Sequence, residues 1–348
     1  MGDFSIDPGE TRQHARTIDT VIADSYSQAA ADISHGGHIS APGFGIFLSW
    51  LEALYIQRLD FLAKDVQGAS DICREIASRL KTAADEAERI EDLNVAGFGG
   101  KPVPWTGYPA AYGQTGTAKL FPAAFTVGAG VTMLEIEATL AAMTMSAALC
   151  PSFIPAVVLA ALIVANPSDI SEAATNLKLV ANDLQTTHDV NFEKACTAVL
   201  RTWKGAGEDA FRHLTTTIKG HLDELAKYIQ LLGEALDSLW NALAEAWKAL
   251  AALTGPFLVW LIAVRVADLV PPLGELLEPV VQVSGAAMTA RVGTILAGVM
   301  AVGSLVGGLV NDLTKDFLAL MALPDRGAAG TPDLTEYKVD GNFALKPL

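Results

Sequence analysis

The sequence predicts an all-α protein, an elongated helical bundle built from two antiparallel helical hairpins and additional apolar helical segments. Alanine and leucine dominate a chain of 348 residues that is 51% hydrophobic, and β-branched residues rarely alternate with polar ones as they do in strands. Apolar residues instead recur every three to four positions over long stretches, which is the spacing of one helix face. The length allows two domains or one elongated body.

The first predicted hairpin covers residues 1–95. It begins with the letters DPGE, in which Asp7 is suited to cap a helix and Pro8 to occupy the first helical position. An apolar stripe follows, and the glycine- and proline-rich stretch 34–45 ends it. A second, longer apolar stripe then runs to the end of the unit. Two helices joined by such a turn fold back on each other.

A second hairpin of the same design is predicted over 169–250. Its start lies in the letters NPSDISE, with Ser168 or Asp169 as the residue that caps the helix. Its two apolar stripes are separated by the letters RTWKGAGEDAF at 201–211. The chain therefore repeats one architecture, helix, glycine turn and helix, without close sequence identity between the two copies.

Between the hairpins lie two segments of different character. Residues 96–122 are rich in glycine, proline and aromatic residues and are predicted to be a linker. Residues 123–168 are predicted to be an apolar helical segment, since no charged residue occurs from 138 to 168. Pro151 and Pro155 interrupt this segment, which argues against a straight membrane-spanning helix.

After the second hairpin, residues 251–323 form a second apolar helical region, followed by a C-terminal tail at 324–348. The stretch 292–310 has no charge over 19 residues, about 28 Å of helix, close to the hydrocarbon thickness of a bilayer. Small residues line one predicted membrane or oligomer face of it: Gly293, Ala297, Ala301, Gly303 and Gly307. Two interpretations remain open, a buried core or oligomer interface and a membrane-inserting segment, and both apply if the protein changes state.

Composition excludes several classes of function. The net charge of −15 argues against nucleic acid as a partner, because phosphates require a basic surface. It also argues against a polybasic anchor on anionic lipids. The N-terminus is acidic and lacks the basic and apolar regions of a cleavable signal peptide.

No catalytic, cofactor or metal site is predicted, and the protein is not expected to be an enzyme. The chain has no GxGxxG, Walker or GxSxG motif. Its three cysteines, Cys73, Cys150 and Cys196, are far apart and are interpreted as small buried hydrophobic residues. The six histidines are scattered over predicted turns and helix surfaces: His14, His35, His38, His188, His213 and His221.

The letters RTWKGAGEDAF, placed between two apolar stripes, resemble the WXG signature of small secreted helical hairpins from actinobacteria and their relatives. That signature is a Trp-x-Gly turn followed by a small residue and an Ala-Phe pair that opens the second helix. Trp203, Gly205, Ala210 and Phe211 match these places. In this resemblance Trp203 anchors the turn and Gly205 lets the backbone reverse.

The first unit is similar to the EspC-type substrates of the same type VII secretion systems. These carry a DP start, a Phe-Gly turn and a closing segment of leucine, a basic residue and two alanines. The matching residues are Phe4, Asp7, Pro8, Phe44, Gly45, Leu80, Lys81, Ala83 and Ala84. The tandem arrangement resembles the N-terminal, channel-associated region of mycobacterial exported toxins, although no toxin domain follows here.

One departure from these families concerns the secretion signal. Type VII substrates usually carry Tyr-x-x-x-Asp/Glu just past the second helix, and the matching place in the first unit is Ala87-x-x-x-Glu91. In such systems a partner chain often supplies this tyrosine.

The resemblances imply a non-enzymatic protein that leaves the cell through type VII secretion, without a cleavable signal, and is secreted or held at the cell surface or membrane. Its partners would be a small WXG-type helical protein or further copies of itself, together with the secretion machinery and a membrane. Two alternatives are a helical pore-forming toxin component that inserts 250–310, and a cytoplasmic adaptor or immunity protein of the same locus.

Overall fold

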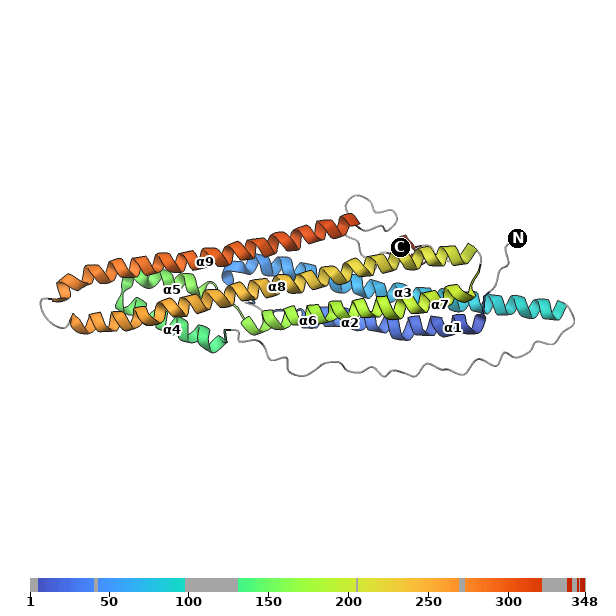
Figure 1. Cartoon of the computed structure of the whole chain (residues 1–348), viewed down its shortest axis with the longest axis horizontal. Helices are drawn as coiled ribbons and strands as arrows, with labels where there is room; N and C mark the ends of the chain where they lie inside the picture. The colour runs from blue at the N-terminus through green and yellow to red at the C-terminus, as the bar shows by residue number, and fades with distance from the viewer. Residues whose placement is uncertain are drawn as a thin grey trace.

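The computed structural model describes residues 6–40, 43–97, 131–204, 206–268, 273–320, 337–339, 343 and 345–347. The molecule is elongated, and its helices run along the long axis (Figure 1). The predicted all-α class is confirmed. The described residues contain only one pair of strands, β1 (Tyr337–Val339) and β2 (Leu345–Pro347), which pair antiparallel.

The first hairpin begins where the sequence predicts it. The Asp7 side chain accepts a hydrogen bond from the Glu10 backbone N–H at 3.0 Å, and Pro8 follows in the first turn. The first arm is continuous through a turn of π-helix, and the second arm is one long helix. The elements are α1 (Pro8–Thr17), η1 (Ile18–Ile22), α2 (Ala23–Gly36), the 3₁₀ turn η2 (Ile46–Leu48) and α3 (Ser49–Gly97).

The second hairpin has the same plan, including a π-helical turn in its first arm. Its elements are α6 (Pro167–Thr186), the π turn η4 (Thr187–Phe192), α7 (Glu193–Thr202) and α8 (Ala206–Ala267). The prediction that Ser168 or Asp169 caps this hairpin is wrong. The cap position is Asn166, because Pro167 already occupies the first turn.

The two hairpins pack against each other as a four-helix bundle. Helix α2 contacts α3 within its own hairpin and α6 of the other, α1 contacts α7, and the turns η1 and η4 meet. At one point of this contact the Asn176 side chain donates to the Gly36 carbonyl at 3.0 Å. Each hairpin thus buries its apolar face on the other. The repeat predicted from the sequence corresponds to two similar hairpins that pack together.

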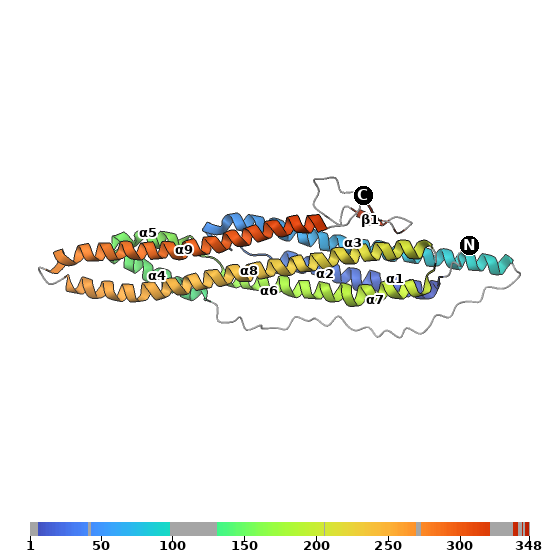
Figure 2. The same ribbon diagram turned by 45° about the horizontal axis from the view of Figure 1, so that its top comes forward.

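A second four-helix arrangement occupies the other half of the molecule (Figure 2). Its members are α4 (Met133–Leu149), the 3₁₀ turn η3 (Pro151–Phe153) with α5 (Ile154–Ala161), the C-terminal half of α8, and α9 (Leu273–Leu320). The predicted interruption at Pro151 and Pro155 is present, and the chain turns back there. Helix α8 does not end at 250 but continues through Pro256 to Ala267, so it belongs to both halves.

The turn between α2 and α3 joins the two halves. Phe44 is buried with its ring edge-on to Tyr55 at 5.7 Å between centroids. Gly45 has φ +75°, and a Cβ there would lie 2.9 Å from the Val164 carbonyl oxygen. The Phe47 N–H donates to the Leu162 carbonyl at 3.0 Å. The Phe-Gly pair therefore packs the first hairpin directly against the end of α5.

We predict that Gly45→Ala lowers the free energy of unfolding by about 2 kcal/mol, because a side chain is strained at this backbone conformation and meets the Val164 carbonyl. The matched control is Gly220→Ala in α8, where a Cβ meets no atom within 4 Å and helix propensity predicts a gain of about 0.5–1 kcal/mol. Urea denaturation measures both changes. Equal effects of the two substitutions would contradict the tight contact at Gly45.

Candidate functional site

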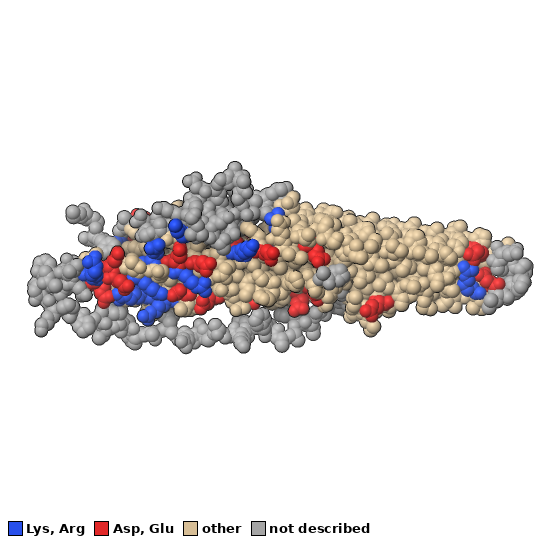
Figure 3. Space-filling model, turned by 180° about the vertical axis from the view of Figure 1, so that it is seen from behind, with Lys and Arg blue, Asp and Glu red and all other residues tan. Residues whose placement is uncertain are grey.

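One half of the molecule carries almost no charge over its length. In α8 residues 249–264 separate Lys248 from Arg265, about 25 Å of helix. In α9 residues 279–290 are uncharged, and so are residues 138–168 of α4 and α5. Figure 3 shows the result on one face, where most red and blue side chains lie over one half, a small group lies at the far tip, and a wide uncharged area separates them. We call the region between, made of residues 138–168, 249–264 and 279–290, the charge-free half.

The apolar surface of the charge-free half is exposed in this structure. Two described helices are long and apolar enough to cross a membrane by length and composition, and only 22% and 33% of their most apolar windows are buried. Nine large apolar residues in or beside this region are between 45% and 71% exposed: Met145, Ile154, Val158, Val259, Ile262, Val266, Leu276, Val280 and Val283. These helix faces lie outside the core of this chain, and they are accessible to lipid or to another protein.

Polar groups inside the charge-free half bond to one another. The Ser152 hydroxyl donates to the Gln282 carbonyl at 2.8 Å, and Thr289 donates to the Ser152 carbonyl at 3.0 Å. The Cys150 thiol donates to the Val281 carbonyl at 3.3 Å. Gly285 permits this approach of η3 to α9, since a Cβ there would meet Cys150 Sγ at 2.3 Å. Internal satisfaction of polar groups is what a structure in contact with hydrocarbon requires.

A compact ionic cluster closes the tip. Arg265 forms ion pairs with Asp268 at 2.9 Å and with Glu278 at 2.5 Å. Its guanidinium also donates two hydrogen bonds to the carbonyl of Leu149, at the C-terminal end of α4. The arginine thus neutralises two acids and caps a helix end that carries partial negative charge.

Charged residues also border the charge-free half at the end away from the tip. Lys248 of α8 lies near the start of α4. The pKa of Glu135 there is lowered by hydrogen bonds from the backbone and side chain of Thr132, and to a smaller extent by Lys248. In α9 the next charged residue after Glu278 is Arg291, which is exposed and has no ion-pair partner among the described residues. It lies 13 residues from Glu278, about 20 Å along the helix.

The predicted stripe of small residues in α9 is divided between two environments. A Cβ at Gly303 or Gly307 would lie 2.6 Å from Leu48 or Trp50 of the same chain, so these two glycines pack on the first hairpin. Gly293 meets no atom within 4 Å at its Cβ position, and Ala297 and Ala301 are exposed. Only the second group is accessible to a partner or to lipid.

The W-x-G turn lies at the opposite end of the molecule. Trp203 is only 4% exposed and its ring lies 5.8 Å from that of Phe211, which is fully buried. Ala210 is half-buried beside them, and Gly205 lies outside the described residues. Gly207, which the sequence did not single out, supports the indole, since a Cβ there would meet its ring at 2.6 Å.

The C-terminal strands cover this aromatic pair. Phe343 packs edge-on against Trp203 at 5.2 Å and against Phe211 at 5.5 Å between ring centroids. Strand β1 is held on α3, where Arg79 donates to the Val339 carbonyl at 3.2 Å and the Val339 N–H donates to Glu75 at 2.5 Å. The predicted C-terminal tail therefore includes a docked segment, which sequence reasoning missed because its contacts lie more than 130 positions away.

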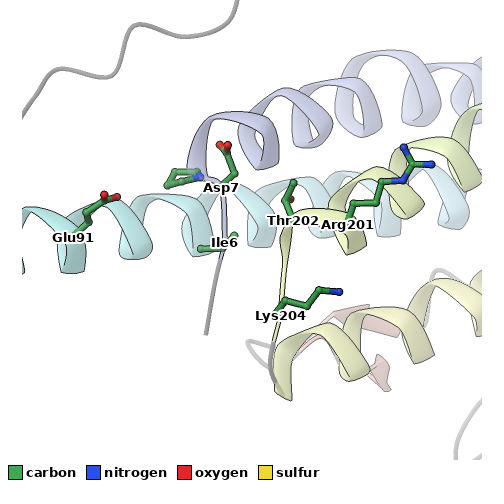
Figure 4. A pocket seen from close by; sticks show the side chains of 7 residues that line it. Ile6, Asp7, Glu91, Arg201, Thr202 and Lys204 are labelled. Atoms are coloured by element: carbon green, nitrogen blue, oxygen red, sulfur yellow. The ribbon is translucent and has the colours of Figure 1, made fainter. Parts of the chain in front are cut away.

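The start of the first hairpin lies beside the W-x-G turn. One open pocket is lined by Ile6, Asp7, Pro8 and Glu91 of the first hairpin and by Arg201, Thr202 and Lys204 of the second (Figure 4). Asp7 and Pro8, predicted from the EspC-type resemblance, thus meet the turn predicted from the WXG resemblance. The other EspC-type residues lie elsewhere: Phe44 and Gly45 form the turn at the far end of this hairpin, Leu80 and Ala84 are buried in α3, and Ala83 is half-buried.

Two histidines are not on turns or helix surfaces, which corrects the prediction for them. His221 lies in the core, with Nε2 2.7 Å from the buried carboxylate of Asp65. This pair joins α8 to α3 across 156 positions of sequence, so spacing alone did not reveal it. His188, in η4, is also fully buried and has Nε2 2.7 Å from Asp223 Oδ1. Burial lowers the pKa of His188, and Asp223 opposes that shift.

The three cysteines are buried and free, as predicted. Burial raises the pKa of Cys73 to about 12, and it also raises the pKa of Cys196.

Comparison of the chain with protein-family models, with curated proteins and with solved structures finds no match. The resemblance to type VII substrates therefore depends on the residues quoted above.

We predict that Phe343→Ala increases quenching of tryptophan fluorescence by acrylamide, because it uncovers the indole of Trp203. The same substitution in a Trp203→Phe background is expected to leave quenching unchanged, since among the described tryptophans only Trp203 has a ring contact with Phe343. An increase of equal size in both backgrounds would show that the C-terminal strands do not cover Trp203.

We also predict that a thiol reagent at pH 8 labels none of the three cysteines in the folded protein and all three in urea. Thiolates are the reactive form, and burial both withholds the reagent and raises the pKa of Cys73 and Cys196. Mass spectrometry counts the labels. Rapid labelling of the folded chain would contradict the burial of these side chains.

Proposed function

We propose that this protein is a non-enzymatic helical protein, exported by type VII secretion, that inserts its charge-free half into a membrane. The observation that carries the proposal is an exposed apolar surface bounded at both ends by charged residues. Membrane lipid matches this surface because hydrocarbon contacts a protein from every side.

The distribution of exposed side chains favours lipid over a single protein partner. The exposed apolar residues lie on α4, α5, α8 and α9, all four helices of the charge-free half. A second copy with one isologous interface would cover a single patch on each molecule. Lipid would cover the exposed apolar residues of all four helices together. Full burial of one such side chain contributes about 1.5–3 kcal/mol.

The uncharged segments are long enough to reach past the middle of a bilayer. The uncharged lengths measured from the tip are about 20 Å on α9 and about 25 Å on α8, against a hydrocarbon thickness of about 30 Å. Arg291 marks the shallower limit, and its long side chain extends toward the interface. The charged residues of the tip, Arg265, Asp268 and Glu278, must enter with the charge-free half. One isolated charged residue at the bilayer centre costs about 3 kcal/mol, and the ion pairs within this cluster reduce that cost.

The type VII part of the proposal is supported by the end of the molecule that lies opposite the charge-free half. Asp7 and Pro8 lie beside the W-x-G turn there, far from the charge-free half. The two hairpins already bury each other's apolar faces, so a small WXG-type partner would bind outside this bundle. The charge-free half also offers a surface for further copies of the chain, which a channel requires.

We predict that the purified protein binds vesicles and releases an entrapped dye, and that Val259→Asp reduces binding at least tenfold. Val259 is 68% exposed in the charge-free half, and an aspartate inside the hydrocarbon costs about 3 kcal/mol. Ile90→Asp is the control, because Ile90 is 49% exposed on α3 in the charged half. Flotation of vesicles with bound protein gives the binding constants.

Three outcomes separate the alternatives. Absence of binding and leakage with every lipid composition and pH overturns insertion. Equal loss of binding in both variants places the lipid contact outside the charge-free half. Recovery of the chain in culture filtrate only when the secretion motor is active supports export, and its retention in the cytoplasm favours the adaptor or immunity alternative.

A further inference from the structure

A polar cluster in the charged half of the molecule combines one buried histidine with two acidic residues. It consists of His188 and Asp189 of the π turn η4 and Asp223 of α8, and one ligand atom from each lies within 4.8 Å of the others. His188 is fully buried, while Asp223 and Asp189 side chains are 37% and 41% exposed. The cluster therefore opens from the core to the surface.

The imidazole has one close polar neighbour, Asp223, at a contact whose geometry is poor for a hydrogen bond. Nε2 lies 2.7 Å from Asp223 Oδ1, yet neither ring nitrogen forms a hydrogen bond among the described residues. A buried polar atom without a partner is costly. The 2.7 Å contact brings Nε2 and Oδ1 to one side of the cluster, where a small shift lets both face a shared cation.

Charge around the cluster is also unbalanced. Three acids lie here, Asp189, Asp223 and Glu193, and the one cation among the ion pairs that join them is Lys219. Lys219 is 2.5 Å from Glu193 and 3.3 Å from Asp189. It can release Asp189 and keep its shorter contact with Glu193, so the excess of negative charge matches a divalent cation.

A third polar group lies in the first hairpin, which packs on η4 through η1. The Tyr26 hydroxyl of α2 is buried and has no hydrogen-bond partner among the described residues. Its pKa is raised by burial first, then by Cys73 and Cys196, and to a smaller extent by Asp223 and Asp189.

We propose that His188, Asp189 and Asp223 bind one divalent transition-metal ion, with Zn²⁺ as the best-matched probe. One imidazole nitrogen and two carboxylate oxygens are a zinc ligand set that leaves a fourth position for water. Imidazole distinguishes this ion from Mg²⁺ and Ca²⁺, which take oxygen ligands. On the π turn η4, His188 is buried and Asp189 is exposed, and such turns are frequent at functional sites.

The test is calorimetric titration of the full chain, stripped with a chelator, with ZnCl₂ and separately with MgCl₂. We expect one equivalent of Zn²⁺ to bind, MgCl₂ to give no comparable binding, and Zn²⁺ to raise the melting temperature. Asp189→Asn is the main variant because this side chain is 41% exposed and its ion pair with Lys219 lies at the surface, where such pairs contribute little to stability. It is expected to weaken zinc binding by at least the 10- to 100-fold typical of losing an outer-shell partner.

His188→Gln should also abolish binding, and circular dichroism checks that this variant folds. His213→Gln, at an exposed histidine of the same helix as Asp223, is the matched control and should bind as the parent does. No zinc binding by the parent, or equal binding by the parent, Asp189→Asn and His188→Gln, overturns the proposal. Equal loss in His213→Gln moves the site to exposed histidines and overturns it as well.

Discussion

The structure depends on the continuity of α8, a single helix of 62 residues. Its N-terminal part buries an apolar stripe on α6, and its C-terminal part packs on α4 and α9. A hydrophobic face must be covered by another element to be stable, and α8 has a face of this kind along its whole length. The two four-helix arrangements are therefore built on one common rod, about 93 Å long at 1.5 Å per residue.

Charge is divided between the two ends of this rod. In the charged half, exposed faces carry ion pairs such as Lys81 with Asp19 at 2.7 Å, of the kind that contributes little to stability but keeps a surface soluble. In the charge-free half the exposed faces are valine, isoleucine, leucine and methionine. Such a division does not improve folding, because exposed apolar side chains gain nothing from water. It has a use if the two halves meet different surroundings.

The sequence was sufficient for features that are determined locally. Asp7 and Pro8 mark a helix start because capping and a fixed φ act within one turn, and the prolines at 151 and 155 interrupt a helix for a local reason. It was insufficient where the partner is remote. His221 meets Asp65 and Phe343 meets Trp203 only after both hairpins have packed, and no spacing rule connects such positions. The cap of the second hairpin was predicted two or three residues too late, because Ser168 and Asp169 have the same capping chemistry as Asn166.

The contact of Phe343 with Trp203 and Phe211 also sets an order for biosynthesis. The aromatic pair belongs to the middle of the chain, whereas the ring that covers it belongs to the end. While the chain is still on the ribosome, and in any chain cut before residue 343, Trp203 stays uncovered although its hairpin is complete. Quality control and proteases that recognise exposed aromatic residues can therefore distinguish an unfinished chain from a finished one at this position.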